Sequence, residues 1–231
     1  MRRLKLTQRL EAAQATVAFH FEKPPAFSYR AGQFVELVLT RDSEEETHAF
    51  TLASAPCEPD LKIVTRMRES GFKETLKALP LGTEVGADGP YGNFVLHEDA
   101  SRPAVFLAGG IGITPFRSML VQAAQDKLPH RLFLFYSNRK PEDAVFLEEL
   151  QILEKRDPNF TLIATMTDPK AAWEGERGHI RNEMIARHAG NLTRPVYYIA
   201  GPPAMARAMR SMLKEAGAGS GDIRVDEFSG Y

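Results

Sequence analysis

The chain has 231 residues, 43% of them hydrophobic, and a formal net charge of -1, so it can build one large domain or two small ones and is not a strongly basic nucleic-acid binder. Its single cysteine, Cys57, excludes an internal disulfide and an iron–sulfur cluster held by four thiolates of this chain. No apolar run approaches the roughly 18 residues of a membrane span, and the basic start carries no apolar signal sequence, so we expect a cytoplasmic protein without a transmembrane segment.

The first part of the chain, residues 4–94, is rich in predicted strands. Apolar and polar residues alternate in several short segments that are separated by Pro, Gly and acidic turn residues. The clearest of these segments are 16–21, 33–39 and 62–67. Short strands at regular spacing predict an antiparallel barrel. The exception is 70–79, where Ser70 can cap a helix with one apolar face.

The pattern changes at the polar, proline-containing stretch 101–103, where we place the domain boundary. This divides the chain into domains over 1–101 and 102–231. Strand-like and helix-like segments alternate in the second domain. The predicted strands are 104–107, 131–137, 160–165, 196–200 and 223–228, and the predicted helices are 115–125, 144–155, 180–188 and 203–216. Such alternation predicts a doubly wound parallel sheet with helices on both faces, and therefore a two-domain α+β chain.

Residues 104–120 read A-V-F-L-A-G-G-I-G-I-T-P-F-R-S-M-L and predict a buried strand, a glycine turn and a helix. Gly109, Gly110 and Gly112 allow a ligand to approach the backbone, and Pro115 suits the first helical position. The free N–H groups and the positive dipole end of the helix favour a phosphate there. The glycine spacing departs from the usual dinucleotide fingerprint because Pro115 stands at the third glycine. A strand–turn–helix without a ligand therefore stays open on this segment alone.

Four short segments resemble the motifs of the ferredoxin–NADP reductase superfamily, in the same order and at similar separations. They are H-A-F-T-L-A-S at 48–54, S-G-F-K at 70–73, G-I-G-I-T-P at 110–115 and A-G-P-P-A-M at 200–205. The resemblance covers nearly the whole chain. It implies an antiparallel β-barrel that binds FAD, followed by an α/β domain that binds NADPH or NADH.

The resemblance assigns flavin contacts to the barrel and to the C-terminus. The implied FAD-binding residues are His48, Phe50, Thr51, Thr65, Arg66, Ser70, Gly71, Phe72, Lys73 and Phe228. Phe50 would lie along the flavin ring, and Thr51, the implied catalytic residue, would offer its hydroxyl to flavin N5. The alternative is that Phe50 is a core residue of an alternating strand. Tyr231 is the second candidate for the aromatic residue that covers the other flavin face.

The chain departs from the family pattern at two motif positions. His48 stands where the family has an arginine that grips the FAD diphosphate, and a histidine replaces that charge poorly near pH 7. We therefore expect Arg66, Lys73 and the backbone N–H groups of 70–73 to supply the missing positive charge. Ala200 stands where the family has a cysteine, which removes a group from the neighbourhood of hydride transfer.

The resemblance also assigns nicotinamide-nucleotide contacts to the second domain. The implied residues are Gly109, Gly110, Gly112, Thr114, Ser137, Asn138, Arg139, Gly201 and Pro202. Thr114 would contact the nicotinamide end and the glycines the diphosphate. No acid follows the second strand until Glu142, which favours NADPH slightly over NADH. The alternative for Arg139 is plain surface charge, and the helical methionines at 205, 209 and 212 are expected to be core residues.

The function that the resemblance implies is an FAD-dependent NAD(P)H oxidoreductase. It would pass hydride from the nicotinamide to FAD and then electrons to an acceptor, for which a ferredoxin-like iron–sulfur protein is the first expectation. Reduction of a small acceptor such as free flavin or a ferric chelate is an alternative within the class. A regulatory module that binds FAD or nicotinamide without turnover is an alternative of another class, and a diaphorase-like part of a larger complex is a third. No metal site is expected.

Overall fold

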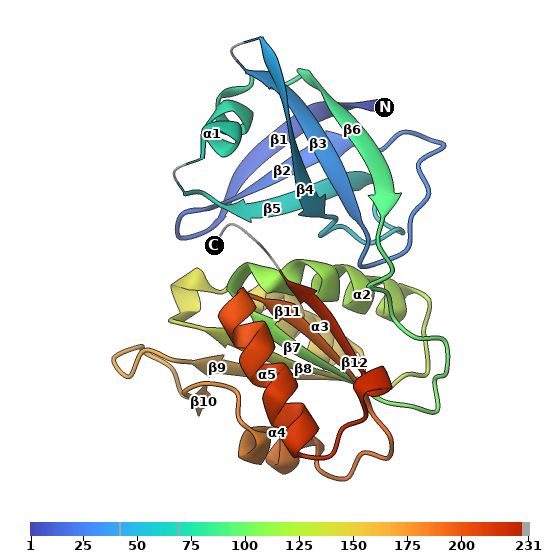
Figure 1. Cartoon of the computed structure of the whole chain (residues 1–231), viewed down its shortest axis with the longest axis vertical. Coiled ribbons are helices and arrows are strands. Elements are labelled where there is room, and N and C mark those ends of the chain that lie inside the picture. The colour runs from blue at the N-terminus through green and yellow to red at the C-terminus, as the bar shows by residue number, and fades with distance from the viewer. Residues whose placement is uncertain (42, 69, 228–231) are drawn as a thin grey trace.

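The computed structural model describes residues 1–41, 43–68 and 70–227, which form two stacked bodies joined by the stretch 92–103 (Figure 1). The first body contains a six-stranded antiparallel sheet in the order β4-β3-β6-β1-β2-β5, and the second a six-stranded parallel sheet in the order β10-β9-β8-β7-β11-β12. The predicted two-domain fold is confirmed. The boundary between residues 101 and 102 stays a prediction, and it falls in the joining stretch.

The antiparallel sheet curls into a barrel because its two edge strands meet at the pair Leu52–Ile63. Its elements are β1 Arg2–Ala13, β2 Thr16–Glu22, β3 Phe34–Arg41, β4 Glu44–Thr51, β5 Asp60–Arg66, α1 Gly71–Ala78 and β6 Glu84–Tyr91. Alternate residues point inward, so that Val35 and Leu37 are buried on β3. Helix α1 closes one end of the barrel with the buried side chains of Phe72 and Leu76.

The parallel sheet is covered on both faces, as its continuous apolar strands predict. Its strands are β7 Ala104–Gly109, β8 Leu132–Asn138, β9 Phe160–Met166, β10 Glu176–Arg177, β11 Val196–Gly201 and β12 Ile223–Glu227, and its helices are α2 Ile113–Gln125, α3 Leu147–Arg156, α4 Asn182–Ala189 and α5 Pro203–Glu215. Helices α2 and α3 pack on one face, and α4 and α5 on the other. Helix α3 begins later than the predicted residue 144 because Phe146 adopts a left-handed φ of 63°.

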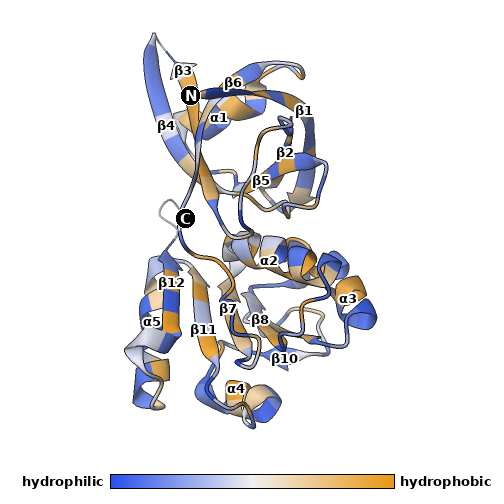
Figure 2. Ribbon diagram, turned by 90° about the vertical axis from the view of Figure 1, so that its right-hand side faces the viewer, coloured by the Kyte–Doolittle hydropathy of each residue, from blue (hydrophilic) through white to orange (hydrophobic). Residues whose placement is uncertain are grey.

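Helix α2 lies between the barrel and the parallel sheet in both views (Figures 1 and 2). Its buried residues Phe116 and Met119 share one apolar cluster with Ala53, Val64 and other barrel residues. The apolar core of the second domain therefore continues into the barrel. Helix α2 connects the two, because its buried side chains belong to the same apolar cluster as the barrel residues. Within the described residues, no helix has the length and apolar character needed to cross a bilayer.

Candidate functional site

The carboxyl ends of the parallel strands and two barrel arginines enclose a cavity of about 390 Å³. The residues that line it and that the sequence predicts as nucleotide-binding are Gly109, Gly110, Ser137, Asn138, Arg139 and Pro202. Thr167 and Met205, which lie at or just after predicted strand ends, also line it. The lining residues without any predicted role are Arg68, Asp143, His179, Ile180 and Met209, and Arg66 was expected on the flavin instead. Segments far apart in sequence thus meet where an open α/β sheet places its ligands.

The donor set of this cavity suits a nucleotide. The Nδ2 atom of Asn138 is buried and has no hydrogen-bond partner among the described residues, although buried amide groups are nearly always paired. Arg66 and Arg139 add positive charge to the cavity wall, one from the barrel and one from the end of β8. The guanidinium of Arg66 lies 3.9 Å from the carboxylate of Asp143. An anionic ligand with an amide or ring acceptor fits these groups.

Close contacts with neighbouring elements explain why glycines occupy the turn after β7. A Cβ at Gly112 would lie 2.2 Å from the carbonyl oxygen of Ala200, so the helix can approach β11 only with glycine there. Gly110 has a φ of 50°, which glycine adopts without strain. The space above Gly109 is filled by Met205, whose sulfur would lie 2.2 Å from an added Cβ. Met205, expected from its helical spacing to be a core residue, is therefore part of the cavity wall.

Thr114 is nearly fully buried at 1% exposure. Its Oγ1 donates a hydrogen bond of 3.2 Å to the carbonyl oxygen of Ile111, within the turn that starts α2. The side chain is not among those that line the cavity. Its contact with the nicotinamide stays a prediction, and in this structure the hydroxyl serves the turn.

The flavin motif lies at the end of β4. Thr51 is 7% exposed and pairs with Phe34 across the barrel sheet. Phe50 is 8% exposed and packs in the barrel core, with its ring centroid 5.8 Å from that of Phe72. His48 is exposed, and its ring stacks on that of Phe72 with the ring centroids 4.3 Å apart. The strand thus holds Phe50 where the core alternative expects it, and its contact with a flavin stays a prediction.

Positive charge gathers around the start of α1, beside this motif. The ammonium of Lys73 donates to the carbonyl oxygen of Arg66 at 3.0 Å. Burial lowers the pKa of Lys73, and the nearby charge of Arg68 lowers it further. No acidic partner of Lys73 or Arg68 is present in the part of the chain that the structure describes. A phosphate would relieve this repulsion between like charges.

Sequence reasoning missed one arginine of this cluster. The guanidinium of Arg41, from β3, lies over Gly71, where an added Cβ would come within 2.4 Å of its Nη1. Glu46 orients it through a hydrogen bond of 2.8 Å to Nε. Ser70 caps α1 by accepting from the Lys73 amide at 3.5 Å. Arg41, which is paired with Glu46, thus reaches the start of α1 from the strand next to that of His48, a contact that no local sequence signal could show.

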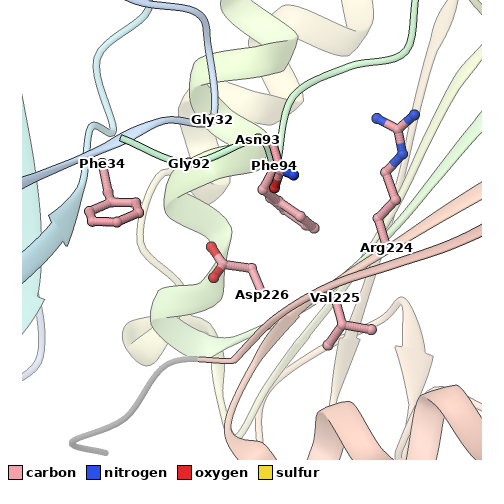
Figure 3. A pocket seen from close by; sticks show the side chains of 8 residues that line it. All are labelled: Gly32, Phe34, Gly92, Asn93, Phe94, Arg224, Val225 and Asp226. Carbon is pink, nitrogen blue, oxygen red and sulfur yellow. The ribbon is translucent and has the colours of Figure 1, made fainter. Parts of the chain in front are cut away.

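A second cavity, of about 560 Å³, opens between the barrel and β12 (Figure 3). Phe34 and Gly92 line it from the barrel side, and Arg224 and Asp226 from β12. Figure 3 shows Asp226 directed toward the barrel wall, and burial raises the pKa of its carboxyl. Because Phe34 is the register partner of Thr51, this cavity adjoins the flavin motif.

Comparison with known proteins agrees with this geometry. A family model described as "Oxidoreductase NAD-binding domain" matches residues 106–211. The chain is 30% identical over 204 residues to ferredoxin–NADP reductase B of Sorangium cellulosum, covering 87% of this chain and 82% of that protein. The chain belongs to the ferredoxin–NADP reductase family.

Solved structures share the fold of this ferredoxin–NADP reductase family member over nearly its whole length. A ferredoxin–NADP⁺ reductase from Neisseria gonorrhoeae, solved with bound FAD and NADP, has a TM-score of 0.84 at 20% identity and covers 98% of both chains. The reductase component of propane 2-monooxygenase from Rhodococcus jostii is 26% identical over 90% of this chain, which spans only 57% of that longer protein. The cofactors of the family are FAD and NAD(P)H, and the expected class of FAD- and NAD(P)H-dependent oxidoreductase is confirmed.

The donor set described above fits these cofactors. The cluster around α1 suits the FAD diphosphate, and the cavity at the strand ends suits the nicotinamide nucleotide. The residue assignments themselves stay predictions. Phe228 and Tyr231, the candidates for the second flavin face, lie outside the described residues.

Proposed function

We propose that the chain takes electrons from NAD(P)H bound in the 390 Å³ cavity and delivers them, through FAD held by the barrel, to a ferredoxin-like iron–sulfur protein. The observation that carries the proposal is the composition of this cavity. Six predicted nucleotide-binding residues meet there with Arg66 and Arg68 of the barrel. A nucleotide bound in it touches both domains, as electron transfer between the two requires.

FAD, when bound, supplies the ability to accept an electron pair and release single electrons. The chain's contribution is to bind, orient and exclude water. Arg41, Lys73 and the N-terminal N–H groups of α1 would hold the diphosphate. Thr51 would place its hydroxyl at the flavin ring from a position that is only 7% exposed. No acid–base group is needed beyond this positioning.

The second domain would hold the nicotinamide nucleotide by backbone and amide groups. Gly109 and Gly110, in the turn that leads into α2, line the cavity and would bring their backbone close to the diphosphate. The unpartnered Nδ2 of Asn138 is a donor for the nucleotide. Arg139, exposed at the end of β8, is placed to pair with a 2′-phosphate, which favours NADPH.

The acceptor is proposed from the relatives and from the cysteine count. The related proteins include a ferredoxin–NADP reductase and reductase components of oxygenases. These 231 residues hold one cysteine and so no four-thiolate cluster of their own. A second candidate function, reduction of a small acceptor such as free flavin or a ferric chelate, is favoured by the 560 Å³ cavity beside the flavin motif.

Anaerobic mixing tests the proposal. The FAD-loaded protein is mixed with NADPH or NADH, and flavin absorbance is followed before and after addition of an oxidised ferredoxin. Bleaching within seconds, followed by recovery on addition of the ferredoxin, is expected. A flavin that stays oxidised contradicts the enzyme and supports a regulatory module. Recovery with free flavin or a ferric chelate, but not with ferredoxin, selects the second candidate.

A further inference from the structure

Arg117 is a buried charge at the centre of the domain interface, outside both cavities. It lies on α2, one turn after Thr114, and is 3% exposed. Its Nη1 donates to the carbonyl oxygen of Ala53 at 3.0 Å, and its Nη2 to Glu58 of the barrel at 2.9 Å. Its Nε donates to Glu149 of α3 at 3.0 Å. One guanidinium therefore joins three segments.

The carbonyl that Arg117 grips belongs to the end of the flavin motif. Ala53 follows Thr51 by two residues, and the hydroxyl of Ser118 donates to the next carbonyl, that of Ser54, at 2.6 Å. One turn further along α2, Gln122 accepts from the backbone N–H of Cys57 at 2.8 Å. Successive turns of α2 are thus bonded to the stretch 53–57, which leads out of the flavin strand.

The other end of the same helix forms the nucleotide site. The turn Gly110–Gly112 opens α2, and Gly112 rests against Ala200 of β11. A helix is stiff over this length. The distance between Thr51 and the glycine turn is therefore set where α2 is fixed to the stretch 53–57.

The ion pairs of Arg117 with Glu58 and Glu149 define how α2 is held against the barrel. Burial would lower the pKa of Arg117, but hydrogen bonds to Glu58 and Glu149 outweigh it and raise the pKa. Burial would likewise raise the pKa of Glu58, yet the hydrogen bonds and charge of Arg117 lower it. Arg117 stays charged, and its planar fork defines both distance and angle. Glu58 reaches it across the interface, whereas Glu149 reaches it from within the second domain.

We propose that Arg117 is a positioning residue, which sets the flavin strand against the nucleotide turn and so fixes the geometry of electron transfer between NAD(P)H and FAD. The inference rests on the proposed function, because it concerns transfer between the two predicted sites. It assigns Arg117 no contact with either cofactor. Its pairing with Glu58 is the part that matters for the rate.

The two carboxylates offer a matched test. Glu58→Gln and Glu149→Gln each remove one charge from the same guanidinium, the first across the interface and the second within a domain. The limiting rate of flavin reduction at saturating NADPH is measured by stopped flow, with NADPH affinity, FAD affinity and thermal stability measured in parallel. We expect Glu58→Gln to lower the limiting rate by about tenfold or more, since small misplacements of reacting groups have large effects. Glu149→Gln should leave the rate near that of the wild type, and both should bind NADPH and FAD with little change.

Hydrogen exchange provides a readout without turnover. Amides of residues 53–57 in the cofactor-free protein should exchange faster in Glu58→Gln than in Glu149→Gln. Arg117→Lys, which keeps the charge but loses the planar fork of the guanidinium, should recover only part of the rate lost in Arg117→Met.

Equal limiting rates in the two glutamine variants, or rates that follow thermal stability alone, overturn the proposal. Should Arg117→Met not fold, the glutamine pair still decides. A wild-type flavin that NADPH does not reduce defeats the proposed function instead.

Discussion

At the residue scale, the chemistry depends on a few side chains whose surroundings the fold decides. Thr51 and Asn138 illustrate this. Each is nearly buried, at 7% and 6% exposure, and each lies at the carboxyl end of a strand. The Nδ2 of Asn138 has no partner among residues 1–41, 43–68 and 70–227, and a ligand or water could satisfy it. Arg139, its neighbour, points to solvent because the strand has ended and side chains no longer alternate into a core.

Replacing Thr51 with alanine tests the predicted contact with flavin N5. The variant should bind FAD normally but be reduced more slowly, because one hydrogen bond, worth roughly 0.5–1.5 kcal/mol, is lost at the reacting atom. Stopped-flow reduction and FAD retention on a desalting column provide the two measurements. Thr16→Ala, on β2, is the comparison for loss of a buried hydroxyl in general, because Thr16 is 2% exposed and lies outside both predicted sites. An unchanged reduction rate in Thr51→Ala rejects the assignment.

Arg139→Ala tests whether a 2′-phosphate is read at the end of β8. The substitution should weaken NADPH binding roughly tenfold, since a hydrogen bond to a charged group contributes about 1.5–3 kcal/mol, while NADH binding changes little. Arg131→Ala is the matched control, because Arg131 is exposed just before the same strand, at its opposite end. Titration of both nucleotides against both variants gives the affinities. Equal weakening of NADPH and NADH by Arg139→Ala would show that the arginine is plain surface charge.

At the element scale, the joining stretch 92–103 is held by a histidine rather than by a strand or helix. The Nδ1 of His97 pairs with the hydroxyl of Tyr198 at 2.9 Å, and its Nε2 donates to the carbonyl oxygen of Arg102 at 2.9 Å. Burial lowers the pKa of His97 from its ordinary 6.5, and although the hydrogen bond to Arg102 opposes this, the positive charge of Arg224 lowers it further. The folded protein therefore favours the neutral form of the His97 ring.

A pH dependence of stability follows from the lowered pKa. Above pH 6.5 the ring is neutral in both the folded and the unfolded chain and imposes no penalty. As the pH falls below 6.5, the unfolded chain takes up the proton first, so the free energy of unfolding decreases until the pH passes the lowered folded-state pKa. His97→Gln should flatten this dependence, whereas His179→Gln, at an exposed position, should not. Thermal unfolding between acidic and neutral pH measures it, and parallel curves for wild type and His97→Gln would contradict it.

Local sequence patterns predicted most, but not all, of the helices and strands. Strand and helix periodicity predicted the alternating second domain and the helix after Ser70, because these patterns follow from burial of one face. The start of α3 was predicted too early, since apolar spacing continues through Phe146 although its φ is left-handed. No pattern predicted β10, which has only two residues and pairs with the end of β9.

At the scale of the whole molecule, two bodies act as one because α2 belongs to both. Its apolar face joins Ala53 and Val64 of the barrel to the core of the second domain, and Arg117 and Gln122 bond the stretch after the flavin strand. The cavity at the strand ends then takes Arg66 from the barrel as part of its wall. Neither domain alone forms the whole wall of this cavity.

The cofactor released on denaturation tests the arrangement of the whole barrel. The purified or reconstituted protein should release FAD and not FMN, because the charges around α1 suit a diphosphate, and FMN carries a single phosphate and lacks the adenosine monophosphate half of FAD. Chromatography of the released flavin identifies it. Recovery of FMN would remove the role given to 70–73 and to Arg41. A colourless chain that also refuses added FAD would argue against the barrel as a flavin site altogether.

The sequence by itself determined what depends on neighbours along the chain: the periodicity of each element, the glycine turn at Gly110–Gly112, the cap at Ser70 and the order of the family motifs. Only the tertiary structure decided what depends on contacts between distant segments. Arg41 over Gly71, Met205 over Gly109 and Arg117 between Ala53 and Glu58 are all of this kind. The physical reason is that a side chain's partners across an interface are set by packing of whole elements, and spacing along the chain carries no record of that packing.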